Sequence, residues 1–147
     1  MGNRDGLSRF VTQVRQPVSV ATPKEVARYL IQNVYQPIEA FEQEEFWVLI
    51  LSARQMVTHS AMISRGTVDS TVCRPADVYR EAVRLNARSI VVAHNHPSGE
   101  PEASSEDQLM TQRLISAGRI IDINLVDHVI VATGGWYSLK EQRPQVW

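Results

Sequence analysis

The chain has 147 residues, of which 44% are hydrophobic and 21% are charged. This length and composition fit one globular domain that needs no disulfide crosslinks, and they exclude disorder for the bulk of the chain. Fifteen Lys and Arg residues against sixteen Asp and Glu residues give a formal net charge of −1. Such a balance disfavours a protein that binds nucleic acid mainly by electrostatics.

No targeting signal or membrane span is expected. The first residues lack the apolar core of a signal peptide, and Gly6 stands where a myristoylation signal has Ser or Thr. The longest apolar run, Phe46 to Leu51, is too short to cross a bilayer. The single cysteine, Cys73, cannot form an intrachain disulfide, which suits a reducing compartment. We therefore expect a soluble, cytoplasmic protein.

The N-terminal region, residues 1 to about 20, is polar and shows no sustained period. We interpret it as an arm or partner-binding extension that precedes a single domain over 21–147. The first helix is predicted over about 23–35, because Thr22 is a good N-cap and Glu25, three residues later, can complete a capping box.

The rest of the chain alternates between short apolar runs, which predict strands, and amphipathic segments, which predict helices. The predicted elements are strand 46–51, strand 56–63, helix 75–87, strand 89–94, a helix from about Ser104 to its stop at Gly118, a strand over 121–131, and a last strand at 136–139. This mixture in one short chain favours a single α/β or α+β layer domain.

The densest chemical signal lies at residues 93–107. His94 and His96 are two residues apart at the end of a predicted strand, so both rings should share one face while Asn95 points the other way. Asp107 falls in the first turn of the next predicted helix, and a strand end and a helix start can converge over one point. Two imidazoles and a carboxylate, with one position left open, are typical of a catalytic zinc site.

A structural interpretation stands beside this one. Ser104 and Asp107 also form a variant of the capping box, in which the serine caps the helix and the acid lies at the positive end of its dipole. An isolated His-x-His pattern often occurs by chance. In this strand–turn–helix context the combination favours a metal site, and a cap would also place Ser104 beside the metal.

These residues resemble the RadC family, a bacterial branch of the JAB/MPN+ (JAMM) metalloprotease superfamily. The resemblance runs from about residue 22 to 140, with Ala103 in place of the family's usual Pro. It rests on His94–Gly99, Ser104-x-x-Asp107, Arg65–Thr67, Arg74-Pro75, Glu81-Ala82, Leu85–Ala87, Asp127-His128 and Tyr137-Ser138. Full-size RadC proteins resemble this chain only in their C-terminal half, after a helical domain of the helix-hairpin-helix type. That difference further weakens the expectation of DNA binding.

The resemblance implies a JAB/MPN domain with a cytidine-deaminase-like fold, in which helices flank a curved mixed sheet. It also implies one Zn²⁺ per chain at a strand–helix junction. His94, His96 and Asp107 would hold the ion, and a water would fill the fourth position. Ser104 matches the serine that donates a hydrogen bond to the developing oxyanion.

The resemblance places the family's acidic residue just before the first buried strand. Glu44 matches it, and would take a proton from the water and return it to the leaving amine. Glu45 would face the opposite side of a strand, so only one of the two can point at the metal, and we favour Glu44. The alternative for Glu42, Glu44 and Glu45 is a solvated acidic approach to a sheet edge.

Other polar residues have weaker patterns. Asp127 is predicted on the same face as the apolar residues that alternate over 121–129. It would accept a hydrogen bond from a ligand histidine, or be a buried carboxylate bonded to backbone or to an Arg. His128, on the opposite face, and His59 are interpreted as structural. Cys73 has no His and Asp nearby in sequence and is not expected to be a nucleophile.

The sequence thus predicts a zinc-dependent metallohydrolase that cleaves an amide bond in a peptide or isopeptide, with a peptide or protein as its substrate. One alternative is an accessory protein in DNA repair or DNA processing, which the historical name of the family suggests but no residue here does. Another is a catalytically inactive binding module. Neither the substrate nor the oligomeric state follows from the sequence.

Overall fold

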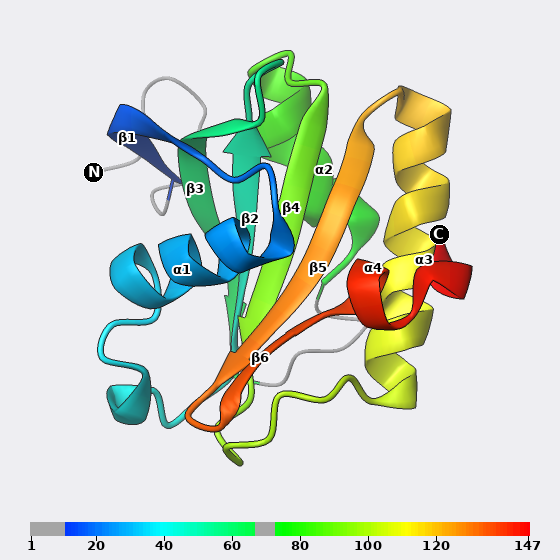
Figure 1. Ribbon diagram of the computed structural model, residues 1–147. Helices are drawn as coiled ribbons and strands as arrows, with labels where there is room; N and C mark the ends of the chain where they lie inside the picture. The colour runs from blue at the N-terminus through cyan, green and yellow to red at the C-terminus, as the bar shows by residue number, and fades with distance from the viewer. Residues whose placement is uncertain (1–10, 67–72) are drawn as a thin grey trace.

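The computed structural model describes residues 11–66 and 73–147, and the predictions for residues 1–10 and Thr67 lie outside this part. The elements are β1 (Val11–Ser19), α1 (Pro23–Asn33), η1 (Ile38–Ala40), β2 (Glu45–Leu51), β3 (Met56–Arg65), α2 (Pro75–Arg84), β4 (Ser89–Asn95), α3 (Ser105–Ile121), β5 (Asn124–Ala132), β6 (Gly135–Ser138), α4 (Leu139–Gln142) and η2 (Pro144–Val146). The strands form one mixed sheet in the order β1-β3-β2-β4-β5-β6 (Figure 1). The predicted α/β class is confirmed.

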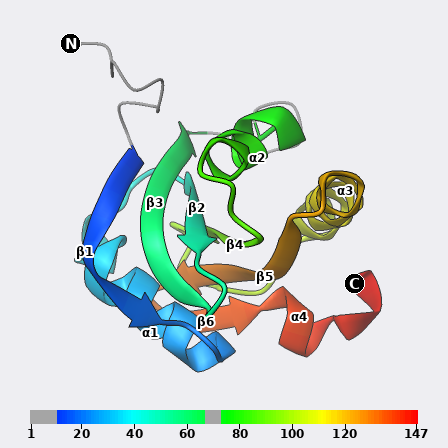
Figure 2. The same ribbon diagram turned by 90° about the horizontal axis from the view of Figure 1, so that it is seen from above.

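Helices cover both faces of the curved sheet. Helix α1 lies on one face, whereas α2 and α3 lie on the other (Figure 2). Each face has its own core, because Leu49 and Val91 pack with α1, while Val48 and Val92 pack with α2 and α3. Strands β2 and β4 lie at the centre and are buried on both faces, which explains their nearly continuous apolar sequences.

Alternation along β4 decides which layer each of its side chains enters. Ile90 and Val92 belong to the core under α2 and α3, and His94 follows them at the same parity. Asn95 has the parity of Val91 and therefore points toward the layer of α1. The pairing of β4 with β5 is parallel and α3 connects the two strands, so α3 begins near the end of β4.

Helix α1 begins as predicted. Thr22 Oγ1 accepts from the backbone N–H of Glu25 at 3.2 Å, and the Glu25 carboxylate accepts from the N–H of Thr22 at 3.1 Å, which completes a capping box. Its buried residues pack on the sheet over β5 and β4. None of the helices in the described part of the chain is long and apolar enough to cross a membrane.

The prediction of a polar arm is wrong for residues 11–19. These residues form β1, the edge strand that pairs antiparallel with β3, with an irregularity between Gln13 and Val18. Most of its side chains are exposed, and only Val11 and Val14 are half-buried. An edge strand with so little buried surface keeps a polar composition, so periodicity does not detect it.

The boundary between α3 and β5 also differs from the prediction. Helix α3 continues past Gly118 to Ile121, and Asp122 ends it in a left-handed conformation with φ 57°. The strand begins at Asn124 instead of residue 121. Gly118 is required for close packing: a Cβ there would lie 2.4 Å from the Ile123 carbonyl oxygen and 2.5 Å from the Tyr79 hydroxyl.

Candidate metal centre

Three side chains meet where β4 ends and α3 begins. The Nε2 atoms of His94 and His96 are 3.0 Å apart. Asp107 places Oδ1 3.3 Å from Nε2 of His94 and Oδ2 3.4 Å from Nε2 of His96. One ligand atom from each residue lies within 4.8 Å of the others, so the group could hold a metal ion. The convergence expected from strand alternation and the first helical turn is present.

The electrostatics of the cluster favour a cation. Burial raises the pKa of Asp107, but its hydrogen bonds to His94 and His96 outweigh burial and hold that pKa well below its usual range. Burial acts to lower the pKa of His96, yet hydrogen bonds to Asp107 and the Glu100 carbonyl, and the charges of Asp107 and Glu44, raise it overall. The carboxylate therefore stays ionised and attracts positive charge.

Ser104 is the N-cap of α3 and holds Asp107 in place. Its Oγ accepts from the Asp107 N–H at 3.0 Å, and Asp107 Oδ2 accepts from the Ser104 N–H at 2.9 Å. The predicted capping box and the predicted cluster thus exist together. Ser104 is exposed, and its hydroxyl proton takes part in no hydrogen bond found within the described residues, so it is available to donate.

Glu44 and Glu45, which precede and begin β2, have different surroundings. Glu44 is half-buried, and its charge contributes to the raised pKa of His96. The Glu45 carboxylate instead accepts from Trp47 Nε1 at 3.0 Å and from Arg65 Nε at 3.1 Å. The Glu45 carboxylate is thus occupied by these two partners, whereas the charge of Glu44 acts on the cluster.

The backbone on both sides of Glu44 is held by Asn95. The Asn95 Oδ1 accepts from the Glu45 N–H at 2.6 Å, and its Nδ2 donates to the Gln43 carbonyl at 3.0 Å. Asn95 is only 1% exposed and lies between the two histidines in sequence. The sequence predicted which face of the strand Asn95 occupies but not its hydrogen bonds, because its partners follow from the pairing of β2 with β4.

Comparison with known proteins identifies the family. A family model described as "RadC-like JAB domain" matches residues 20–144. The chain belongs to this family. Its relatives include UPF0758 proteins of Symbiobacterium thermophilum (35% identical over 93% of the chain), Bacillus cereus (39% over 84%) and Thermotoga maritima (39% over 87%). The matches cover 56%, 53% and 55% of those relatives, so the chain spans little more than half of their length.

In this JAB domain, one extra residue in β5 puts Asp127 and His128 on the faces of the sheet opposite to those predicted. Successive residues of β4 pair with Leu125 and then with Asp127, so Val126 forms a bulge. Asp127 consequently points away from the face of Leu125, and His128 shares the face of Leu125 and of His94. The sequence carries no local signal for this bulge, since only the pairing with β4 reveals it.

The contacts found for Asp127 within the described residues do not include the ligand histidines, and this decides between the two alternatives left open for it. Its carboxylate accepts from Ser138 Oγ at 2.6 Å and from the backbone N–H groups of His128 at 2.7 Å and Lys140 at 3.2 Å. The alternative of a buried carboxylate bonded to backbone describes it. Burial raises the pKa of Asp127, although these hydrogen bonds act against burial.

His128 is the functional residue that sequence reasoning missed. Its Nε2 lies 2.8 Å from Nδ1 of His94, and its Nδ1 lies 2.7 Å from the Thr111 hydroxyl. All three side chains are buried, and burial lowers the pKa of His128 well below its usual value. The ring is therefore neutral, and it contacts the candidate metal centre directly, which a purely structural interpretation did not foresee.

The remaining candidates lie elsewhere in the JAB domain. His59 is half-buried on β3, with Nδ1 3.1 Å from its neighbour Thr58 Oγ1. Cys73 is buried, forms no disulfide among the described residues, and has its Sγ 3.3 Å from Ser64 Oγ. Neither residue lies in the metal-ligand group found among the described residues.

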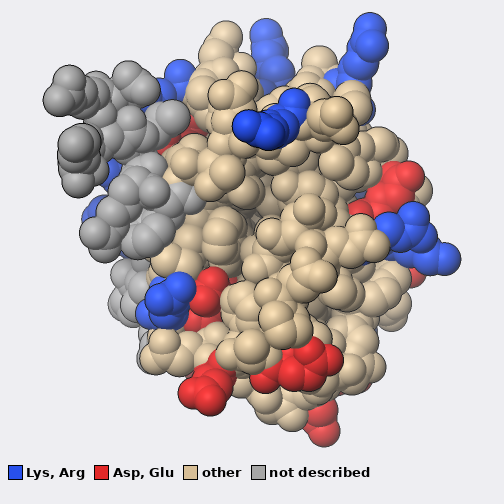
Figure 3. Space-filling model, turned by 90° about the vertical axis from the view of Figure 1, so that its left-hand side faces the viewer, with Lys and Arg blue, Asp and Glu red and all other residues tan. Residues whose placement is uncertain are grey.

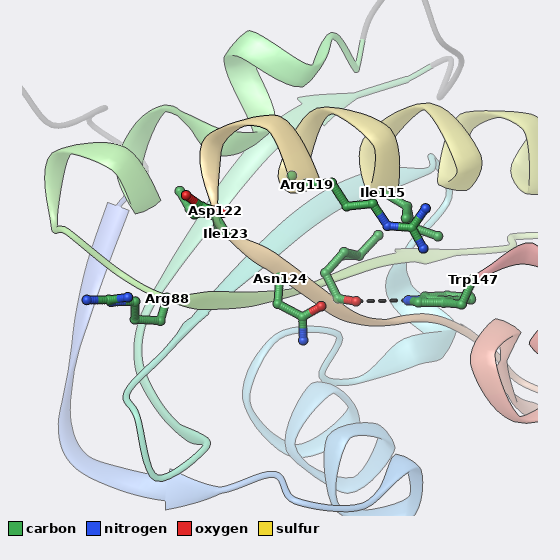
Figure 4. Close-up of a pocket in the computed structure, with 9 residues that line it drawn as sticks. Arg88, Ile115, Arg119, Asp122, Ile123, Asn124 and Trp147 are labelled. Atoms are coloured by element: carbon green, nitrogen blue, oxygen red, sulfur yellow. Dashed lines mark hydrogen bonds between the residues drawn. The ribbon is translucent and has the colours of Figure 1, made fainter.

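One hollow on the described surface is separate from this centre. It measures about 500 Å³ and lies at the C-terminal end of α3, where Arg119, Asp122 and Trp147 contribute to its lining (Figure 4). Trp147 Nε1 donates to the Leu125 carbonyl there at 2.9 Å. Helix α3 has 17 residues and is therefore ~25 Å long. The hollow and Asp107 thus lie at opposite ends of one helix.

Proposed function

We propose that this domain is a zinc-dependent metallohydrolase that cleaves an amide bond in a peptide or isopeptide. The single observation that carries the proposal is the convergence of His94, His96 and Asp107 at a strand–helix junction. Membership in the RadC-like JAB domain family supports the same conclusion. Because the chain spans little more than half of its curated relatives, the activity is proposed for this domain alone.

The donor set suits zinc. Two imidazole nitrogens and one carboxylate oxygen are ligands that Zn²⁺ accepts readily, and three protein ligands leave one coordination position for water or substrate. A bound zinc ion would lower the pKa of water to ~7 and polarise the substrate carbonyl. Magnesium and calcium are disfavoured, since they prefer all-oxygen surroundings.

Glu44 is the proposed general base. Its half-buried carboxylate lies near His96, and the Asn95 amide fixes the backbone on both sides of it. Glu44 would accept the proton of the attacking water and donate it to the leaving amine. Glu45 is unsuited to this role because Trp47 and Arg65 already occupy its carboxylate.

Ser104 is the proposed oxyanion donor. Its Oγ already accepts the Asp107 N–H and the residue is exposed, so its rotatable hydroxyl proton would be left to donate to a substrate oxygen. One such donor is worth about 2.7–4 kcal/mol of transition-state stabilisation where its removal has been measured. The cap keeps this hydroxyl next to Asp107 in the absence of substrate.

The charge around the centre favours a peptide or protein substrate over a nucleic acid. Segments 36–45 and 96–112, which contain Glu44 and two of the three candidate ligands, hold eight acidic residues but no Lys or Arg. In Figure 3, several acidic side chains lie at the lower end of the face with one Lys or Arg side chain beside them, and other Lys and Arg side chains lie at the upper end. A phosphodiester backbone would be repelled at the acidic end.

Metal content is the first test. The protein is purified without added metal and analysed by plasma mass spectrometry beside His96→Ala. About one zinc per chain, lost in the variant, is the expected result. Folded wild-type protein that contains no zinc and takes up none when it is added would refute the metal site and leave a binding module.

Hydrolysis is tested next with peptide and isopeptide substrates. Glu44→Gln is expected to keep zinc and lose activity, whereas the matched variant Glu45→Gln is expected to keep both. The opposite order would overturn the assignment of the base. Binding to DNA that weakens steeply with rising salt would instead favour the DNA-processing alternative.

A further inference from the structure

We propose that Thr111 and His128 form a hydrogen-bond relay that sets the tautomer of His94 and so prepares its Nε2 to bind the metal. They are positioning residues, since they act on the centre through His94 and Asp107. The inference rests on the metal site proposed above and adds two residues to it.

The relay consists of three short contacts that connect Asp107 to His94. Thr111 Oγ1 lies 2.6 Å from the Asp107 carbonyl oxygen, His128 Nδ1 lies 2.7 Å from Thr111 Oγ1, and His94 Nδ1 lies 2.8 Å from His128 Nε2. Thr111, His128 and His94 are at most 1% exposed, so water does not compete for these bonds. The three contacts therefore join two candidate ligands, Asp107 and His94.

The direction of every bond follows from the Asp107 carbonyl. A carbonyl oxygen can only accept, so the single hydroxyl proton of Thr111 is donated to it. Thr111 Oγ1 can then only accept from His128, which places the ring proton of His128 on Nδ1. The two ring nitrogens of His128 face Thr111 and His94, and the ring is fully buried, so a charge on it would have no compensating carboxylate in contact with it. A neutral ring with its proton on Nδ1 has a bare Nε2, and His94 Nδ1 donates to it.

This order leaves Nε2 of His94 without a proton. Neutral His96 has the same arrangement, because its Nδ1 lies 2.8 Å from the Glu100 carbonyl and donates to it. Two bare nitrogens 3.0 Å apart, both next to the Asp107 carboxylate, repel one another unless a proton on Nε2 of His96 or a metal ion lies among them. The relay thus arranges the lone pairs that a metal ion requires before any ion arrives.

The relay also connects the elements that carry the ligands. Thr111 lies one helical turn after Asp107 on α3, His128 lies on β5, and His94 lies on β4. A change in any of these elements is transmitted to the ring orientation of His94. Outer hydrogen-bond partners of metal-binding histidines are typically worth 10- to 100-fold in metal affinity.

Zinc affinity tests the relay in the full chain. Thr111→Val removes the hydroxyl with little change of shape, and we expect its zinc Kd, measured by competition with a chelator, to rise at least tenfold. Thr111→Ser keeps the hydroxyl and is expected to bind as the wild type does. Thr58→Val is the matched control, because the Thr58 hydroxyl also donates to a carbonyl, that of Ile50 at 3.2 Å, but lies on β3, which β2 separates from β4.

The tautomers are read directly by ¹⁵N NMR of the histidine rings in metal-free wild-type protein. Protonated Nδ1 and bare Nε2 on both His94 and His128 are expected, and this measurement needs neither zinc nor a folded variant. A proton on Nε2 of His94 would overturn the relay. A Thr111→Val variant that binds zinc as tightly as the wild type would overturn the relay too. A wild-type protein that binds no zinc would instead refute the proposed function, and the tautomers would then be judged by NMR alone.

Discussion

Replacing Gly118 by Ala should destabilise the domain, although helix propensity alone predicts the reverse. Alanine is better than glycine inside a helix by about 1 kcal/mol. The new Cβ, however, would lie 2.4 Å from the Ile123 carbonyl oxygen and 2.5 Å from the Tyr79 hydroxyl, against 3.4 Å or more for an ordinary contact. The carbonyl belongs to the backbone and cannot move alone, since the adjoining Ile123 N–H donates to the Gly118 carbonyl at 2.9 Å.

The expected loss of stability follows from the groups that the new Cβ would displace. Overpacking of this kind costs about 1–3 kcal/mol. A displaced Tyr79 would also lose its buried hydrogen bond to the Leu114 carbonyl, 2.7 Å long, which is worth about 1 kcal/mol. After the gain in propensity, we expect Gly118→Ala to lower the free energy of unfolding by about 2 kcal/mol. With an m-value of about 2 kcal/mol/M, the urea midpoint should fall by about 1 M.

Urea denaturation followed by circular dichroism measures this change, and Tyr79→Phe provides the control. The phenylalanine removes the hydroxyl from the contact, so Gly118→Ala should cost less in the Tyr79→Phe background than in the wild type. A midpoint that rises in Gly118→Ala would refute the reasoning. Strictly additive effects of the two substitutions would show that the tyrosine hydroxyl has no part in the clash.

Three further outcomes are expected. Asp127→Ala should lower the free energy of unfolding by about 3 kcal/mol, because it leaves two buried donors and one partly buried donor without their acceptor, and an unchanged urea midpoint would contradict this. Trp147→Ala should cost about 2 kcal/mol through the lost bond to the Leu125 carbonyl and lost packing, and wild-type stability would show that the residue is unimportant. Free zinc at a thousandfold excess over its Kd should stabilise the wild type by about 4 kcal/mol in a thermal melt, and a chelator should reverse this. His96→Ala should show neither effect. Equal shifts of the melting temperature in both proteins would place the zinc elsewhere.

The parts of the site that obey local rules could be predicted from the sequence. Strand alternation places His94 and His96 on one face, and a capping residue places Asp107 in the first turn of α3. The start of α1 at Thr22 follows from the same capping chemistry. Each of these positions depends on neighbours within a few residues, so no knowledge of the pairing of distant strands is needed.

The parts that depend on distant partners could not be predicted. The bulge at Val126 appears only when β5 pairs with β4, and it exchanges the faces of Asp127 and His128. Asn95 acquires its role from Gln43 and Glu45, about fifty residues earlier in the chain. Gly118 resembled a helix stop, but its actual partners are a tyrosine of α2 and a carbonyl beyond the end of α3. In each case the deciding contact is made across the fold.

Because Asn95 holds the backbone on both sides of Glu44, the segment before β2 can open locally while the histidine ligands on β4 stay in place. The Glu45 amide proton is bonded to the Asn95 side chain, so its rate of exchange with solvent deuterium reports how often the segment before β2 detaches. Such a local opening would break the Asn95 bonds on the α1 side of β4 and free the segment that carries Glu44, while His94, on the other side of the same strand, would keep its contact with His128. The proposed general base can therefore leave the centre for brief intervals while the candidate metal ligands stay in place, and the exchange rate of this one amide measures how often that happens.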